Sequence, residues 1–389
     1  MVGREPERRV DLSARLARSG PRKLLAIDGG GIRGVLSLKL LEDIERLLIK
    51  ESKRDDYRLA DYFDCVAGTS TGGIIAAGIA VGMSVKEILD FYLNNGAAMF
   101  DKASIIRRLQ YQYKSEPLAL QLQHVFGATT TLGASEVETL LLLVMRNATT
   151  DSPWPVSNNP FAKYNDRKHG ACNLHFPLWQ LVRASTAAPT YFPPEVIDCG
   201  GKPFVFVDGG VTMYNNPAFQ MFLMATVDRY WAQAPADSRS WKTGVDDMLI
   251  VSIGTGTSAG ENYSLRPDEM NLIFNATTIP SALMYAALNE QDFLCRVFGD
   301  CVAGAPLDRE VDDMIGSRGP LDKKLFRYVR YNAELTREGL AALGCGGIEP
   351  TRVQKLDSID ALADLQKIGT AVAAQRIKPA HFNFGMFKP

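Results

Sequence analysis

The stretch FDCVAGTSTGGIIAAGIAV, residues 63–81, decides how we expect this chain to fold. Residues 63–67 form a short apolar run that predicts a buried β-strand, and residues 74–81 are small and apolar, as in a buried helix. Between them the chain matches G-x-S-x-G, with Gly68, Ser70 and Gly72 at the fixed positions. The glycines permit a sharp strand-to-helix turn that exposes the serine hydroxyl. The alternative is a turn that only caps a helix, and this motif alone does not decide between them.

A second glycine-rich turn lies upstream, where the apolar residues 23–27 predict another buried strand. The sequence DGGGIRG follows at residues 28–34 and leads into a helix predicted over residues 35–50. The N–H groups of Gly29, Gly30 and Gly31 are expected to form an anion-binding hollow, to which Arg33 adds a positive charge and which Gly34 closes. In acyl transfer such a hollow would be an oxyanion hole.

Residues 29–34 also fit G-x-G-x-x-G, the dinucleotide-binding fingerprint. That interpretation requires an acidic residue about 20 positions further on, at the end of the next strand. The corresponding region, KESKRDDY at residues 50–57, does not resemble the end of a strand. A dinucleotide-binding enzyme therefore remains a weaker alternative.

A third motif follows a strand predicted over residues 204–207 and consists of Asp208, Gly209 and Gly210. A carboxylate at a strand end could reach Ser70, although an aspartate in a turn also commonly bonds its own backbone. All three motifs follow predicted strands, and open α/β sheets bind their ligands at the carboxyl ends of strands. We therefore expect the motifs to meet.

The remaining pattern alternates strands with helices, which predicts an α/β fold in layers. A fourth strand is expected at residues 248–253, and helices are expected around residues 140–145, at 177–188 and at 357–374. Ser84 with Glu87, and Ser135 with Glu138, would cap two helices, and residues 151–168 would form a loop. We expect one domain over residues 22–389, with core motifs at 24–256, a helical extension at 257–389, and a disordered or peripheral lead-in at 1–21.

Composition excludes several classes of function. A formal net charge of -1 argues against a general binder of nucleic acid polymers. No apolar run approaches the roughly 20 residues of a membrane-spanning helix, and residues 1–21 lack the apolar segment of a secretory signal. The six cysteines form no CxxC pair, which is typical of a reducing cytoplasm. His169, Cys172 and His175 cluster without a fourth ligand, so we expect no metal site.

A serine–histidine–acid triad remains an open alternative to a carboxylate acting directly as the base. In the chain order of α/β-hydrolases, only His381 among the four histidines comes late enough to serve. A buried aspartate can instead have its pKa raised towards neutral pH, which suits a base.

In their order and approximate spacing, the three motifs resemble those of the patatin-like phospholipase family. Residues 28–34 resemble its oxyanion motif, residues 68–72 its nucleophile elbow and residues 208–210 its D-G-[AG] motif. Residues 184–192 (ASTAAPTYF) and 215–217 (NNP) agree, so the resemblance covers about residues 24–256.

The resemblance implies a three-layer α/β/α patatin-like fold with a mostly parallel central sheet. It also implies a Ser70–Asp208 dyad, no cofactor for chemistry, and membrane phospholipid as substrate, reached by peripheral contact at the inner face of the membrane. Residues 105–113 could form a lid. Some bacterial relatives are activated by cyclic nucleotides in antiviral defence, so a cyclic-nucleotide activator and a homo-oligomer are further hypotheses. A His381-dependent esterase and a non-enzymatic storage or binding protein with this fold are the alternatives.

Overall fold

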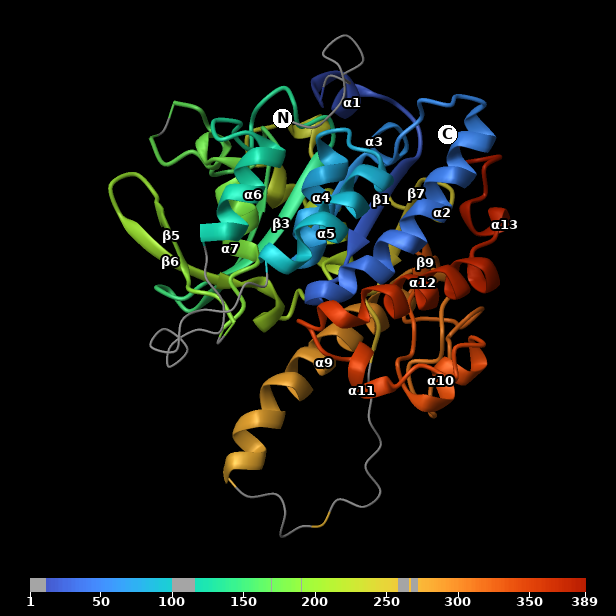
Figure 1. The fold of residues 1–389 in the computed structure, drawn as a ribbon. Coiled ribbons are helices and arrows are strands. Elements are labelled where there is room, and N and C mark those ends of the chain that lie inside the picture. The colour runs from blue at the N-terminus through green and yellow to red at the C-terminus, as the bar shows by residue number, and fades with distance from the viewer. Residues whose placement is uncertain (1–11, 100–115, 169, 190, 258–265, 267–271) are drawn as a thin grey trace.

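The computed structural model describes residues 12–99, 116–168, 170–189, 191–257, 266 and 272–389. These residues form a mixed sheet of nine strands covered by helices (Figure 1). The strands are β1 (Arg22–Ile27), β2 (Cys65–Thr69), β3 (Leu140–Asn147), β4 (Ser152–Ser157), β5 (Glu195–Asp198), β6 (Pro203–Asp208), β7 (Met248–Ile253), β8 (Asp300–Ala303) and β9 (Arg327–Tyr331).

The strand order is β5-β6-β3-β2-β1-β7-β9-β8, and β4 pairs with β3 outside this path. Strands β3, β2, β1, β7, β9 and β8 run parallel, whereas β4, β5 and β6 pair in antiparallel fashion. The expectation of a mostly parallel sheet is thus confirmed. Strand β6 has a consequence for the site, because it runs back beside β3 and places Asp208 opposite Met145.

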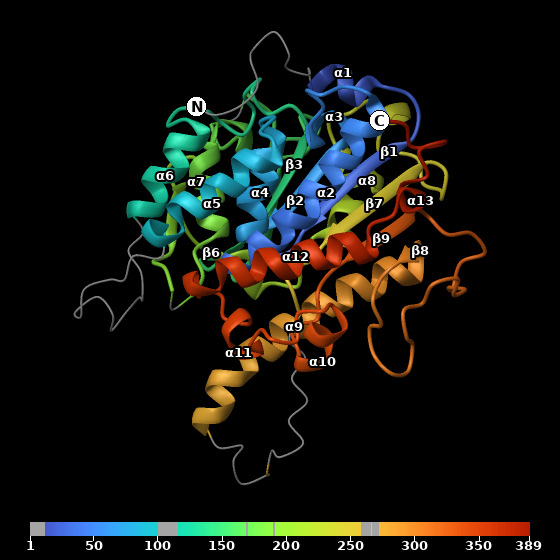
Figure 2. The same cartoon turned by 45° about the vertical axis from the view of Figure 1, so that its right-hand side comes forward.

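Two hydrophobic cores lie on the two faces of the sheet. Along β1, Leu25 and Ile27 belong to one core, and Leu24 and Ala26 belong to the other, because successive side chains of a strand point to opposite faces. Helices on both faces make a three-layer α/β/α arrangement, which confirms the expected fold class. In Figure 2, α2, α4 and α12 lie over one face and α8 lies behind the sheet.

The helices are α1 (Leu12–Ala17), α2 (Gly34–Ser52), α3 (Leu59–Tyr62), α4 (Thr71–Ala80), α5 (Val85–Met99), α6 (Glu116–Phe126), α7 (Leu178–Ser185), α8 (Ala218–Thr226), α9 (Leu272–Phe298), α10 (Arg337–Ala342), α11 (Pro350–Val353), α12 (Leu362–Arg376) and α13 (Pro379–Phe382). The N-terminal half of α9 projects from the body in both views (Figures 1 and 2). No helix among the described residues is both long enough and apolar enough to cross a membrane.

The predicted helix around residues 140–145 is wrong, because these residues form strand β3. A run of six apolar residues fits a buried strand as well as a buried helix, and pairing with β2 and β4 settles it. The side chain of Glu138, expected to cap that helix, is fully buried instead. Residues 151–168 are not all loop either, since β4 lies within them. The capping box of Ser84 and Glu87 is confirmed: the Ser84 N–H donates to the Glu87 carboxylate, and the Glu87 N–H donates to the Ser84 hydroxyl.

The two ends of the chain also differ from expectation. Residues 257–389 are not purely helical, because β8 and β9 extend the central sheet beyond β7. Within the expected lead-in, α1 carries Arg15, whose side chain is buried and donates to the backbone oxygens of Glu138, Phe63 and Ala60. Residues 1–11 and the lid expected at 105–113 lie outside the described residues.

Candidate active site

Ser70 lies on a sharp turn between β2 and α4, as the G-x-S-x-G pattern predicts. Its backbone has φ 55° and ψ −124°, a conformation that residues other than glycine rarely adopt. The flanking glycines are required by close packing. A Cβ on Gly68 would lie 2.0 Å from the Gly72 carbonyl oxygen, and a Cβ on Gly72 would lie 2.2 Å from that of Ile27. The turn is therefore strained at Ser70, which is typical of functional sites.

Asp208 lies beside Ser70, although for a different reason than parallel strand ends. Strand β6 is antiparallel to β3 and ends opposite Met145, one residue beyond the β3 residue that pairs with Thr69. The Ser70 hydroxyl donates a hydrogen bond of 2.6 Å to Oδ2 of Asp208. The N–H of Gly210 donates to Oδ1 at 2.6 Å. The hydroxyl and the carboxylate thus meet, as the three motifs together predicted.

The Asp208 side chain is suited to accept a proton near neutral pH. Only 4% of the residue is exposed, and this burial raises the pKa of the carboxyl group to about 6. Hydrogen bonds from Ser70 and Gly210, and the positive charge of Arg183, act in the opposite direction and limit the rise in pKa. Above that pH the carboxylate is ionised and can take the hydroxyl proton.

The C-terminal end of α7 and the residues just after it hold both members of the pair. The N–H of Ser70 donates to the Ser185 hydroxyl at 2.9 Å, and that hydroxyl donates to the Val144 carbonyl oxygen at 2.6 Å. The N–H of Asp208 donates to the Ala187 carbonyl oxygen at 2.9 Å. The sequence predicts a helix at residues 177–188 without a site role, and the resemblance of residues 184–192 to the family was the available signal for one.

The glycine loop lies directly against Ser70. A Cβ on Gly29 would lie 3.3 Å from the Ser70 Cβ and only 2.3 Å from Oδ1 of Asn215, so only glycine fits without displacement. The Gly29 N–H donates to the Asn215 carbonyl oxygen at 3.0 Å and is therefore already engaged. Among the hydrogen bonds of the described residues, none uses the N–H of Gly30 or Gly31. Those two amides remain the candidate oxyanion donors.

Arg33 follows the loop within a short 3-10 helix, η2 (Gly31–Arg33). Its Nε donates to the Gly30 carbonyl oxygen at 3.3 Å. Burial lowers the pKa of Arg33 to about 10, while Asp28 and Tyr191 partly oppose this effect. The guanidinium therefore stays charged at neutral pH. The other motif glycines also lie at close approaches: a Cβ on Gly34 would meet the Thr71 hydroxyl, and one on Gly209 would meet the Val144 carbonyl oxygen.

The histidine alternative gains no support from the geometry. The Nδ1 of His381 lies 2.7 Å from the hydroxyl of Tyr331, and burial lowers the pKa of the imidazole. The carboxylate that accepts the Ser70 hydroxyl belongs to Asp208. The dinucleotide alternative also lacks the acidic residue that it requires at the end of the next strand. That strand, β2, ends at Thr69 and is followed by Ser70.

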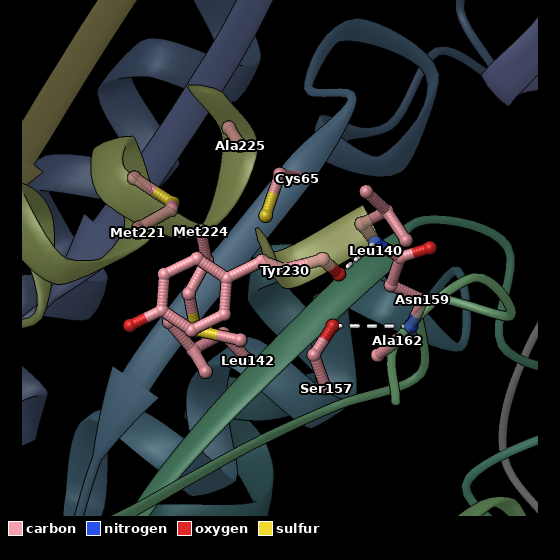
Figure 3. A pocket seen from close by; sticks show the side chains of 10 residues that line it. All are labelled: Cys65, Leu140, Leu142, Ser157, Asn159, Ala162, Met221, Met224, Ala225 and Tyr230. Carbon is pink, nitrogen blue, oxygen red and sulfur yellow. Dashed lines mark hydrogen bonds between the residues drawn. The ribbon is translucent and has the colours of Figure 1, made fainter. Parts of the chain in front are cut away.

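Two further features bear on the site: possible metal ligands and a pocket. In the part of the chain that the structure describes, no group of three potential metal ligands occurs, while His169 of the expected cluster lies outside it. A small pocket opens near the first residue of β2, at the opposite end of that strand from Ser70 (Figure 3). Its lining consists of Cys65, Leu140, Leu142, Ser157, Asn159, Ala162, Met221, Met224, Ala225 and Tyr230. This lining is mostly apolar and contains neither Ser70 nor Asp208, so the pocket does not mark the reacting centre.

Comparison with known proteins assigns the chain to a family. Residues 25–222, just over half of the 389 residues, match the family described as patatin-like phospholipase. The chain belongs to the patatin-like phospholipase family. The resemblance noted from the three motifs is thereby confirmed, and all three lie within the matched residues.

Relatives of the chain come from bacteria and plants. It is 30% identical to a "cGAMP-activated phospholipase" of Vibrio cholerae over 64% of this chain and 67% of that protein. A protein of the same description from Escherichia coli is 30% identical over 63% of this chain and 64% of its own length. "Patatin group M-3" of Solanum tuberosum is 31% identical over 61% of each chain. The matches thus span about two thirds of the bacterial relatives and less of the plant one.

Proposed function

We propose that this patatin-like phospholipase hydrolyses fatty-acyl esters of membrane phospholipids, with Ser70 as nucleophile and Asp208 as general base. The observation that carries the proposal is the 2.6 Å hydrogen bond from the Ser70 hydroxyl to a buried carboxylate. A nucleophile and a base within hydrogen-bond reach are the minimum that covalent catalysis at a serine requires. The family membership supports a lipid ester as the substrate.

In the first half of the proposed reaction, the Ser70 oxygen attacks the ester carbonyl carbon. The hydroxyl proton passes to Oδ2 of Asp208, and the carbonyl electron pair moves onto its oxygen. The N–H groups of Gly30 and Gly31, with the nearby charge of Arg33, stabilise that oxyanion. The bond to the leaving alcohol then breaks, the proton on Asp208 passes to the alcohol oxygen, and an acyl-enzyme remains.

In the second half, water attacks the acyl-enzyme and Asp208 takes a proton from it. The same two amides stabilise the second oxyanion. When the bond to Ser70 breaks, the serine oxygen recovers the proton and the fatty acid is released. Each half of the reaction returns Asp208 to its starting charge, so protons and bonds balance with Ser70, Asp208, the ester and one water molecule.

The decisive experiment is lipid mass spectrometry on phospholipid vesicles incubated with the wild type and with Ser70→Ala. Release of fatty acid and lysophospholipid by the wild type alone supports the proposal. Fluorophosphonate labelling that persists in Ser70→Ala would remove Ser70 as the nucleophile. Absence of hydrolysis by the wild type, with and without candidate activators, would instead support a storage or binding protein.

A second element of the proposal is activation by a cyclic nucleotide in the cytoplasm, at the inner face of the membrane, as part of antiviral defence. The two bacterial relatives described as cGAMP-activated phospholipases support it. The test is to measure vesicle hydrolysis while titrating cGAMP and other cyclic di- and oligonucleotides. A rise in rate that saturates with one of them is expected, and no change with any of them would remove this element.

A further inference from the structure

A buried ion pair joins the start of the glycine loop to strand β9, outside the residues that match the family. Nη1 of Arg330 donates to Oδ1 of Asp28 at 2.9 Å, and Nη2 donates to Oδ2 at 2.6 Å. Asp28 is fully buried and 3% of Arg330 is exposed. Two parallel bonds fix the direction of a carboxylate as well as its distance. The pair therefore holds the Asp28 side chain in one orientation.

The three residues that follow Asp28 have no side chain that could hold the loop in place. Residues 29–31 are glycines, which have the largest backbone freedom of any residue. The hydrogen bonds of these glycines use their backbone groups alone. The Gly29 N–H donates to the Asn215 carbonyl oxygen, the Thr255 hydroxyl donates to the Gly29 carbonyl oxygen, and the Nε and N–H of Arg33 donate to the Gly30 carbonyl oxygen. Between Ile27 and Ile32, Asp28 is the one residue with a side chain beyond hydrogen. The Arg330 contact is therefore the loop's side-chain anchor.

Arg330 is itself held by α9. Its Nε lies 3.7 Å from Oδ2 of Asp292, and its Nη1 also donates to the Ser252 hydroxyl at 2.8 Å. Asp292 accepts two bonds from Arg296, at 2.9 Å and 2.8 Å, and a further one from the Tyr328 hydroxyl at 2.9 Å. Burial disfavours the charge on Arg330, but Asp28 and Asp292 outweigh it and raise the pKa of the guanidinium. Arg330 is therefore a permanent cation between two carboxylates.

We propose that Arg330 is a positioning residue for the oxyanion hole: through Asp28 it holds the Gly30 and Gly31 amides where the developing negative charge forms. The inference rests on the proposed function. It gives strand β9 and helix α9 a task in catalysis that lies outside the family-matched residues 25–222. Stability alone is a weak reason for such a pair, because apolar residues often replace buried ion pairs without loss. Geometric control of a glycine loop is a task that apolar residues cannot perform.

The test compares Arg330→Lys with Arg22→Lys in the full chain. Lysine keeps the charge but cannot form the two-pronged contact. Arg22 is a matched control because it is also buried, begins the same strand that Asp28 follows, and bonds the backbone oxygens of Arg15 and Leu16 at the opposite end of β1. Turnover of a soluble p-nitrophenyl ester is measured per site, with sites counted by the final extent of fluorophosphonate labelling.

We expect Arg330→Lys to lower kcat per labelled site by about 10- to 100-fold, because displacement of oxyanion donors by about 1 Å has effects of that size. KM is expected to change less than about twofold, and the rate of fluorophosphonate labelling should fall in parallel, since the phosphonyl oxygen occupies the same hole. Arg22→Lys should keep the wild-type kcat per site even if its melting temperature falls.

Asp28→Asn provides an independent variant if Arg330→Lys does not fold, because it is isosteric and leaves Arg330 paired with Asp292. It should lower kcat in the same way, and its effect should not add to that of Arg330→Lys. Wild-type kcat per site in the folded variants, or a change confined to KM or melting temperature, would overturn the inference while leaving the proposed function intact. No labelling and no turnover in the wild type would overturn the proposed function, and the inference with it.

Discussion

Asp64 and Asp208 are both buried aspartates beside the central sheet, but they meet different partners and lie at its two edges, meaning here the two opposite ends of strand β2. Asp64 precedes β2 and accepts a hydrogen bond from Arg18 at 3.0 Å and from the Lys23 N–H at 2.9 Å. Arg15 and Arg22 also lie within 4 Å of it. Asp208 meets a hydroxyl and an amide. Within the described residues, no cation lies within salt-bridge distance of Asp208.

The difference is that cations surround Asp64, whereas Asp208 has neutral hydrogen-bond donors. Three arginines lie around Asp64 and compensate its charge. Neutral donors compensate Asp208 only in part, and burial raises its pKa to about 6. A base must be able to gain and lose a proton near working pH, and the environment of Asp208 allows this. The predictions below test whether the two edges of the sheet are separable in this way.

The largest expected effect is on activity, from Asp208→Asn. An amide cannot take the Ser70 proton, so kcat/KM on a soluble ester should fall by about 10³- to 10⁴-fold, as in other enzymes whose serine loses its acid–base partner. Circular dichroism would confirm that the fold is kept. A loss of less than about tenfold would show that another group serves as the base, and His381→Ala would then be the variant to measure next.

The second effect falls on stability, from Asp64→Asn. This change leaves Arg15 and Arg22 buried without their charge partner. We expect the free energy of unfolding to drop by about 3–5 kcal/mol, as for other buried pairs that lose one member. Activity per fluorophosphonate-labelled site should stay within about twofold of the wild type. A large loss per labelled site would contradict the separation of the two edges.

The sequence predicted the edge that carries the candidate active site better than the rest because its signals are local. Gly68, Ser70 and Gly72 lie within five residues, and their strand–turn–helix setting could be inferred from neighbouring residues. The three motifs were also correctly expected to meet. The reason for the Asp208 contact was not predicted, because the antiparallel direction of β6 depends on pairing with β3, which was mistaken for a helix.

Contacts between residues that are far apart in the sequence gave no such local signal. Arg330 reaches Asp28 over 302 positions, and Ser185 reaches Ser70 over 115. A lone arginine in a strand pattern, or a serine in a helix, looks ordinary until the sheet is assembled. The role of residues 257–389 could not be predicted for this reason, since their strands join the sheet next to β7.

A moderate effect is expected from Ser185→Ala. The change removes the acceptor of the Ser70 N–H, and a lost hydrogen bond at a strained turn should let Ser70 move. We expect kcat to fall about tenfold, equivalent to about 1.4 kcal/mol, with KM little changed. Ser157→Ala is the matched control, because Ser157 is also buried and its hydroxyl accepts the Asn159 N–H far from the pair. Equal losses in both variants would show a general packing effect.

The smallest effect concerns the pH at which activity begins. If Asp208 is the base, kcat/KM for the free enzyme should fall about tenfold per pH unit as pH drops below about 6, because protonation removes the base. The buried Arg183 lowers the pKa of Asp208. Glu195 and Glu116 in turn favour the charged form of Arg183 and oppose the lowering of its pKa by burial. Removing its charge in Arg183→Met should therefore raise the pKa of Asp208 and move the acid limb to higher pH, by up to about one unit.

The control for Arg183→Met is Lys242→Met, which removes the same charge from an exposed residue paired with Asp247. The acid limb of the kcat/KM profile of Lys242→Met should stay at the wild-type pH, because a distant exposed charge is screened by salt. A limb that moves to lower pH in Arg183→Met, or moves equally in both variants, would contradict the assignment. Desolvation is the largest cause of the raised pKa of Asp208. Removing the charge of Arg183 should therefore change that pKa by less than burial does. Burial of Asp208 beside neutral donors would then remain the main reason that this edge of the sheet is reactive.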